Sequence, residues 1–233
     1  MLASRWKILF SIALLVLALD QVTKYLAVAE LTRAFELEQA KSLPEKLEAF
    51  LGAEKLERVR TRLVVVQKDH LRFKYVENPG AAWGMFGGLS DAVRVPFFVV
   101  VSLLAVTFLV LFFRRLSDRH RLLQVSLALV LGGALGNFVD RILRGYVIDF
   151  IDLHWRNDPR LHWPTFNVAD IAISVGVALL LAQTFFGNTR FDTELEPASE
   201  PQADREPGEA PAGNRAVAAT GFEHAPTDFE RKE

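Results

Sequence analysis

Four aspartates in the second half of the chain are candidates for catalysis. Asp140, Asp149 and Asp152 fall within "GNFVDRILRGYVIDFID", residues 136–152, directly after an apolar run, and Asp170 opens the next apolar run. Two carboxylates held close together keep one shared proton, because like charges near each other cannot both ionise easily. One can then activate water while the other protonates the reacting group. The residue types predict acid–base hydrolysis, and spacing alone leaves open which two form the pair.

Other common catalytic chemistries find no support in the sequence. There is no cysteine, and no G-x-S-x-G, H-E-x-x-H or phosphate-cradling glycine loop is present. His154 and His162 flank a tryptophan-containing stretch with no cysteine or nearby Glu at metal-ligand spacing. We therefore expect neither a metal nor an organic cofactor. A net charge of -1 argues against nucleic acid as the main partner.

Four apolar stretches approach the ~20 residues that a helix needs to cross a bilayer. They cover residues 9–29, 95–113, 122–138 and 168–187. The basic residues Arg5 and Lys7 and the arginine-rich connector 114–121 should face the cytoplasm by the positive-inside rule. Both termini are then cytoplasmic, and the long loop after the first span lies outside.

The first apolar stretch also resembles a secretory signal peptide, because it follows two basic residues and ends in Ala27-Val28-Ala29. Against that interpretation stand Asp20 and Lys24, which lie four residues apart on one helical face. Such a pair suits a retained helix whose polar face looks into a bundle. We expect the first stretch to be a permanent span.

The outer loop should contain two different parts. Residues 30–62 are rich in Leu, Glu, Lys and Arg, and their pattern predicts two short amphipathic helices with Pro44 and Gly52 as breaks. Residues 63–76 alternate around a polar turn and predict a small β hairpin, which with the segment up to residue 90 forms a cradle and lid. Residues 188–233 have the composition of a disordered cytoplasmic tail.

This topology brings polar side chains from separate spans to one depth, near the outer surface. An ionised side chain at mid-bilayer costs about 2.5 to 3.5 kcal/mol, and less toward the interface. Several at one level therefore predict a shared polar site. Structural alternatives remain for each: Asp20 and Lys24 form an intrahelical ion pair, Asn137 bridges helices, and Arg141 and Asp170 complement helix dipoles.

Five ordered sequence boxes resemble those of bacterial lipoprotein signal peptidase, also called signal peptidase II. They are "DQVTKYLA" from Asp20, "ENPGAAWGMF" from Glu77, "GGALGNFVDRI" from Gly132, "YVIDFID" from Tyr146 and "FNVADIAISVG" from Phe166. The resemblance covers residues 5–187. It implies four transmembrane helices with an extracytoplasmic β cradle and an amphipathic helical insertion. The implied activity is that of an inner-membrane aspartic endopeptidase, which cuts diacylglyceryl-modified prolipoproteins just before the lipidated cysteine.

The resemblance also implies roles for individual residues. The catalytic pair is Asp149 and Asp170. The substrate-binding positions are Asn78 and Arg141, which hydrogen-bond the substrate main chain, and Asn137 and Asn167, which order the pocket. The supporting positions are Asp20, Lys24, Asp140, Gly80 and Ala82. The implied partners are lipid-modified prolipoproteins and membrane lipids, with the active site on the periplasmic side of a monomer that needs no cofactor.

Two features depart from the family pattern. Trp83 stands where the family usually has Phe, and both the insertion at 30–62 and the tail are longer than typical. Two rival functions also deserve a test: a proton-coupled transporter or lipid-binding membrane protein, and a four-span interaction protein without chemistry. A transporter should carry polar residues on both halves of its spans, whereas the inner halves here are almost purely apolar.

Overall fold

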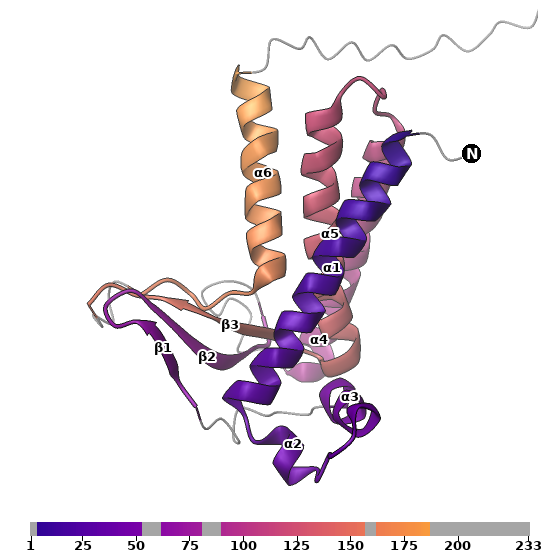
Figure 1. Ribbon diagram of the computed structural model, residues 1–233. Coiled ribbons are helices and arrows are strands. Elements are labelled where there is room, and N and C mark those ends of the chain that lie inside the picture. The colour runs from indigo at the N-terminus through magenta and orange to yellow at the C-terminus, as the bar shows by residue number, and fades with distance from the viewer. Residues whose placement is uncertain (1–3, 53–61, 81–89, 157–161, 187–233) are drawn as a thin grey trace, which may run out of the picture. The chain divides into compact units, whose positions relative to one another are not determined.

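Four long helices form the body of the protein. The computed structural model describes residues 4–52, 62–80, 90–156 and 162–186, all within the first of two compact units, Met1–Asn188. The long helices are α1 (Ser4–Leu31), α4 (Asp91–Arg114), α5 (Arg121–Arg144) and α6 (Val168–Phe186) (Figure 1). Each is long and apolar enough to cross a membrane. This confirms the four predicted spans, and the chain is a multi-pass membrane protein.

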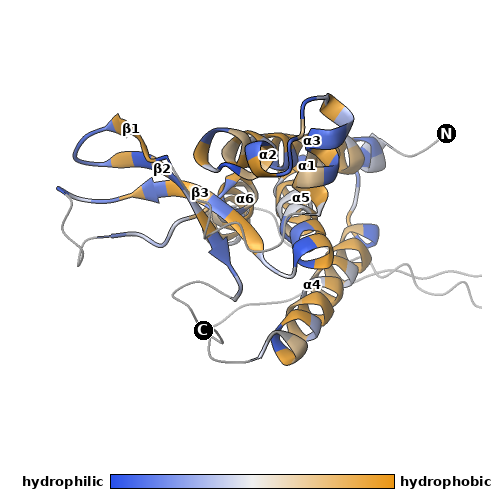
Figure 2. Ribbon diagram, turned by 90° about the horizontal axis from the view of Figure 1, so that it is seen from below, coloured by the Kyte–Doolittle hydropathy of each residue, from blue (hydrophilic) through white to orange (hydrophobic). Residues whose placement is uncertain are grey.

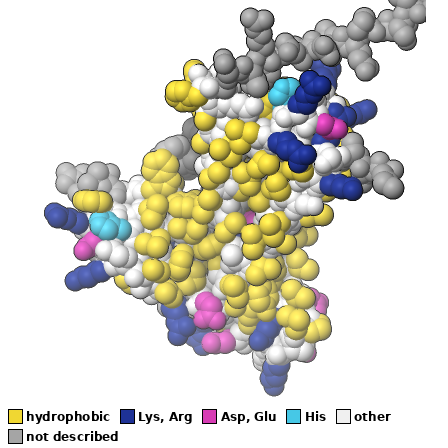
Figure 3. Space-filling model, turned by 45° about the horizontal axis from the view of Figure 1, so that its top comes forward, with side chains coloured by type: hydrophobic (Ala, Val, Ile, Leu, Met, Phe, Trp, Pro, Cys, Tyr) yellow, Lys and Arg dark blue, Asp and Glu magenta, His cyan; other side chains and the backbone are white. Residues whose placement is uncertain are grey.

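The outer surface of the bundle is apolar, as a lipid-facing surface must be. Figure 3 shows hydrophobic side chains covering the middle of one face, while Lys and Arg gather toward its ends. Figure 2 shows α4 apolar around most of its circumference. Phe108 and Leu104, on α4, are among its many exposed side chains. Lipid replaces water around such residues, so their exposure carries no hydrophobic cost in the membrane.

Helix α5 is the centre of the bundle and packs against α1, α4 and α6. Gly136 allows the close approach near the sheet end of the bundle: a Cβ there would lie 2.5 Å from Asp20 Oδ2 and 3.3 Å from Ala169 Cβ. Small residues at such positions let helix backbones approach closely in membranes. The glycine thus brings α1 and α6 to the same point of α5, and α1 packs in the bundle as a retained span should.

Helix α5 is longer than the apolar stretch that predicted it. It continues past Phe138 to Arg144 and ends at Gly145, whose φ of 77° and N–H bond to Arg141 O, at 3.1 Å, form a left-handed C-cap. Hydropathy falls in this last part because it contains Asp140 and Arg144. These two residues pair with each other on one helical face, so the helix persists.

A three-stranded antiparallel sheet lies at one end of the bundle (Figure 1). Its strands are β1 (Val64–Gln67), β2 (Leu71–Asn78) and β3 (Val147–Leu153), in the order β1-β2-β3. The β1–β2 pair confirms the predicted hairpin. Strand β3 was not predicted, since its segment was treated only as a short connection between spans. In it, Asp149 pairs with Val76 and Asp152 with Arg72 of β2.

The loop after α1 carries two short helices at the same end, α2 (Ala34–Leu37) and α3 (Leu43–Leu51) (Figure 1). Pro44 was predicted to be a helix break. It lies instead in the first turn of α3, where its missing N–H costs nothing. Ser42 and Glu45 close that turn with a reciprocal capping box. Phe50 near the end of α3 is buried in a cluster with Tyr75, Tyr146 and Ile148.

Candidate active site

A cavity of about 480 Å³ opens where β2, β3 and the sheet-side ends of α5 and α6 meet. Its polar lining consists largely of residues singled out in the sequence, namely Asn78, Asn137, Arg141, Asp149 and Asp170. The rest of the wall combines aromatic and apolar side chains, including Trp163, Phe166 and Ile173, with the polar residues Glu77, Thr165 and Ser174. A concave site with few convergent polar groups is the usual form of a small binding or reaction site.

Asp149 enters this cavity from β3 and is 1% exposed. Its Oδ1 accepts a hydrogen bond from Asn167 Nδ2 at 2.7 Å, and its Oδ2 accepts one from Asn78 Nδ2 at 3.0 Å. Burial, and next the charge of Asp170, raise the pKa of Asp149 to about 8, against the opposing effect of the two amide hydrogen bonds. Asp149 therefore retains its proton at neutral pH.

Asp170 lies in the first turn of α6, and the helix terminus itself fixes its carboxylate. Asn167 precedes the helix, and its Oδ1 accepts from Asp170 N at 3.0 Å while Asp170 Oδ2 accepts from Asn167 N at 3.2 Å. This is a reciprocal capping arrangement. Asp170 Oδ1 accepts from Asn137 Nδ2 at 2.8 Å. Asn167 thus donates to both cavity carboxylates, to Asp149 from its side chain and to Asp170 from its backbone.

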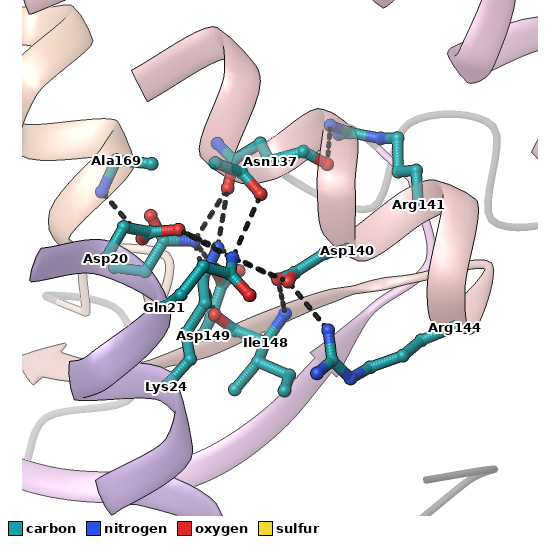
Figure 4. Close-up of polar contacts among 12 residues, drawn as sticks. Asp20, Gln21, Lys24, Asn137, Asp140, Arg141, Arg144, Ile148, Asp149 and Ala169 are labelled. Carbon is teal, nitrogen blue, oxygen red and sulfur yellow. Dashed lines mark hydrogen bonds and ion pairs between the residues drawn. The ribbon is translucent and has the colours of Figure 1, made fainter. Parts of the chain in front are cut away.

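A fully buried ion network, drawn in Figure 4, adjoins the cavity through Asn137, which lines the cavity wall. Lys24 Nζ is 2.7 Å from Asp20 Oδ2, 2.8 Å from Asp140 Oδ2 and 3.2 Å from Asn137 Oδ1. Asp20 Oδ1 accepts from the backbone N of Ala169 at 3.0 Å, so α1 supplies a cap for α6. The pairing of Asp20 with Lys24 is intrahelical, yet it also joins three helices.

Asp140 uses every acceptor site that its carboxylate offers. Its Oδ1 accepts from Arg144 Nη1 at 2.9 Å and Gln21 Nε2 at 3.2 Å. Its Oδ2 faces Lys24 and accepts from the backbone N of Ile148 at 3.1 Å. Asp140 does not line the cavity but holds β3 one residue before Asp149 (Figure 4).

The remaining predicted residues surround the cavity. Asn78 Oδ1 accepts from Gly80 N at 3.1 Å, which turns the chain after β2 along the cavity wall. Arg141 Nη1 donates to Asn137 O at 3.2 Å, and its guanidinium lies 5.2 Å from the centre of the Phe98 ring. This leaves Arg141 as a cationic donor on the cavity wall. Ala82 and Trp83 lie outside the described residues.

Asp152 belongs to a different environment, although it is only three residues from Asp149. An odd separation places the two side chains on opposite faces of the strand. Asp152 pairs with Arg72 and His162 and lies 3.1 Å from Lys74 Nζ. Burial alone would raise the pKa of Asp152, but the hydrogen bonds from Arg72 and Lys74 lower it overall. The geometry therefore leaves Asp149 and Asp170 as the two described aspartates that line the cavity, whose wall also includes Glu77.

Sequence reasoning missed three residues behind the site: Gln21, Arg144 and Phe50. Gln21 adjoins Asp20 and bridges Gly136 O and Asp140. Arg144 follows Asp140 by one helical turn, a signal that was available had the helix been extended beyond its apolar part. Phe50 carried no signal, because its contact with Arg144 joins distant segments. Within the described residues, no group of three His, Cys, Asp or Glu is placed to hold a metal ion.

Comparisons with known proteins agree on one family. Residues 12–186 match the family model described as "Signal peptidase (SPase) II". The lipoprotein signal peptidase of Anaeromyxobacter sp. (strain Fw109-5) is 52% identical over 178 residues, which are 76% of this chain and 84% of that protein. The lipoprotein signal peptidase of Syntrophotalea carbinolica is 39% identical, over 76% of this chain and 91% of that protein.

Two solved structures have a similar fold. One bacterial membrane enzyme, determined by the in meso method, is 30% identical, with a TM-score of 0.54 over 76% of this chain and 87% of its own. A second structure, also titled a bacterial membrane enzyme by the in meso method, is 28% identical, with a TM-score of 0.55 over 78% of this chain and 94% of its own. The helices and sheet described above are therefore an arrangement shared with these enzymes.

Proposed function

This chain belongs to the signal peptidase II family, and we propose that it is an aspartic endopeptidase that cleaves the signal peptide from diacylglyceryl-modified prolipoproteins immediately before the lipidated cysteine. Membership of this protease family displaces the rival transporter and interaction-protein interpretations. The observation that carries the aspartic mechanism is the pair of carboxylates, Asp149 and Asp170, in one cavity and joined through Asn167.

In the proposed reaction the two carboxylates have different tasks. Asp149 starts protonated, because burial and its neighbour raise its pKa to about 8. Asp170 takes a proton from water, the hydroxide adds to the scissile carbonyl carbon, and Asp149 passes its proton to the carbonyl oxygen. Collapse of the tetrahedral intermediate breaks the C–N bond. The leaving amine takes the proton from Asp170, and the new hydroxyl proton returns to Asp149.

Substrate positioning falls to the other polar groups of the cavity. Arg141 donates to a substrate carbonyl, and Asn78, already fixed against Asp149 and Gly80, adds a side-chain amide for main-chain recognition. Asn137 and Asn167 keep the two carboxylates at fixed positions. The signal peptide helix and the diacylglyceryl chains remain in lipid beside the bundle, so the membrane itself delivers the scissile bond to the cavity.

The proposed orientation places the cavity on the periplasmic side of the inner membrane. Arg5 lies at the opposite end of the bundle, where it pairs with Asp118 at 3.7 Å and donates to Leu116 O in the α4–α5 connection. That short connection also carries Arg114, Arg115, Arg119 and Arg121. A cluster of basic residues beside short loops marks the cytoplasmic side. In this orientation α1 begins and α6 ends in the cytoplasm.

The function is tested by a gel-shift cleavage assay in detergent micelles with a lipidated prolipoprotein. Asp149→Asn and Asp170→Asn should each lower the rate by at least about 100-fold, since each removes a proton-transfer group. Thermal melting confirms that the variants are folded. An unlipidated version of the same substrate should not be cut. Full activity in either aspartate variant would eliminate the proposed pair.

A further inference from the structure

Helix α3 reaches the buried ion network through one residue, Phe50. Arg144 donates from Nε and Nη2 to the backbone oxygen of Phe50, at 3.1 Å and 3.0 Å. The guanidinium carbon also lies 4.1 Å from the centre of the Phe50 ring. The Arg144 side chain is fully buried. A buried guanidinium needs acceptors for its five N–H groups, and Phe50 supplies both an acceptor and an aromatic face.

The opposite side of the same guanidinium leads to the catalytic strand. Arg144 Nη1 donates to Asp140 Oδ1 at 2.9 Å, and Asp140 Oδ2 accepts from the backbone N of Ile148 at 3.1 Å. Ile148 directly precedes Asp149. Three consecutive contacts therefore join α3, the end of α5 and β3 (Figure 4 shows the last two). No residue of α3 belongs to the described lining of the cavity, so α3 has no direct route to the substrate through it.

We propose that Phe50 is a positioning residue for peptide cleavage: it seats Arg144, which fixes Asp140, which in turn holds β3 so that Asp149 faces Asp170. The inference rests on the proposed function. If the Phe50 ring and carbonyl withdraw, Arg144 loses two hydrogen bonds to that carbonyl and its aromatic contact, and it must turn away to find another acceptor. Asp140 then loses one of its two cations, and the strand that carries Asp149 is held less firmly.

The arrangement separates this role from ordinary packing. Phe50 also packs on Tyr25, with ring centres 5.5 Å apart, so a smaller side chain weakens the seating of α3 as well. Leu47 lies on the same helix but is 43% exposed, and Leu47→Ala is a matched control. Phe50→Leu keeps an apolar side chain and removes the aromatic face. Arg144→Lys keeps the charge and removes the fork that joins Phe50 to Asp140.

The test measures kcat and KM for a lipidated prolipoprotein, using the full chain in micelles. Phe50→Leu and Arg144→Lys should each lower kcat by about three- to tenfold with KM within about twofold, because a displaced catalytic group slows the reaction without altering the binding wall. Leu47→Ala should match the parent. The Phe50→Leu/Arg144→Lys double variant should be no slower than the slower single variant, since both break one line of contacts.

Two results would overturn the inference. One is that Phe50→Leu keeps the parent kcat, and the other is that the two single effects multiply in the double variant. If the parent protein cleaves the substrate, Asp149→Asn abolishes cleavage and Phe50→Leu leaves kcat unchanged, only this inference is removed. A parent protein that cleaves no lipidated substrate removes the proposed function with it.

Discussion

Aspartate side chains occur in two kinds of surroundings in the described part of this protein. At the cavity, the described donors to Asp149 and Asp170 are amides, from Asn78, Asn137 and Asn167. The other aspartates have cations among their partners: Lys24 for Asp20, Lys24 and Arg144 for Asp140, and Arg72, Lys74 and His162 for Asp152. Amides orient a carboxylate but leave room for a proton, whereas a paired cation favours the ionised form.

Strand β3 shows the difference over the shortest distance. Asp149 and Asp152 are 1% and 0% exposed, so neither carboxylate is open to solvent. Yet the pKa of Asp149 is raised to about 8 while that of Asp152 is lowered. What differs is the identity of the partners on the two faces of the strand. Among the described contacts, cations therefore touch the bracing carboxylates, whereas amides hold the proposed catalytic pair.

Removing the shared cation should have the largest effect on stability. Lys24→Met leaves Asp20 and Asp140 buried without the ammonium between them, and we expect a loss of about 3 to 5 kcal/mol in the free energy of unfolding. Denaturation in micelles measures it. Asp149→Asn, at the amide-lined site, should be as stable as the parent or more stable. Equal stability of the Lys24 variant and the parent would break the comparison.

Raising the pH should remove the proton from Asp149 and so lower both stability and activity. The folded protein holds a proton on Asp149 between the ordinary pKa of 3.8 and about 8, whereas the unfolded chain has released it. The contribution of this proton to the free energy of unfolding is fully present below pH 3.8 and is lost as the pH rises through about 8. We expect kcat to fall about tenfold per pH unit above that point. Melting curves of Asp149→Asn should lack this pH dependence, and a rate that stays constant well above pH 8 contradicts the assignment.

The smallest expected effect comes from the other face of β3. Asp152→Asn removes a charge from a cluster whose Arg72 and Lys74 are partly exposed, so we expect a loss of only about 1 kcal/mol. The lowered pKa means that this stability exists above 3.8 and disappears as pH falls through the lowered value. Cleavage should stay within about threefold of the parent rate. A fall in the cleavage rate as large as that of Asp149→Asn would contradict the distinction between the two faces of β3.

Local sequence signals were sufficient for much of the fold. Apolar length predicted the four spans, and alternation around residues 67–69 predicted the β1–β2 hairpin, because each depends on neighbouring residues. Strand β3 was missed because it pairs with β2, nearly half the described chain away in sequence, and no local feature announces that partner. The end of α5 was missed because its polar residues are satisfied by one another and by Phe50 rather than by apolar burial.

The candidate site was predictable as a set of residues but not as an arrangement. Residue chemistry alone left four aspartates open, and the sequence boxes narrowed them to Asp149 and Asp170. For Asp170, the sequence offered a helix-terminal role and a chemical role as alternatives. The structure supports the first directly through Asn167 and places the same carboxylate on the cavity wall, so the two are compatible. The buried contacts of Asp140 could not be predicted from the sequence, because its partners Gln21, Lys24 and Ile148 belong to other elements of the fold.

The hydrogen bond from the backbone of Ala169 to Asp20 joins α6 to α1. Because α1 is synthesised before α6, Asp20 has no hydrogen bond from Ala169 until α6 has left the ribosome. Until that donor arrives, the chain also lacks Asp170, and the proposed catalytic pair is incomplete. We therefore expect a partly synthesised chain to be inactive, because the proposed site is complete only once α6 has been made.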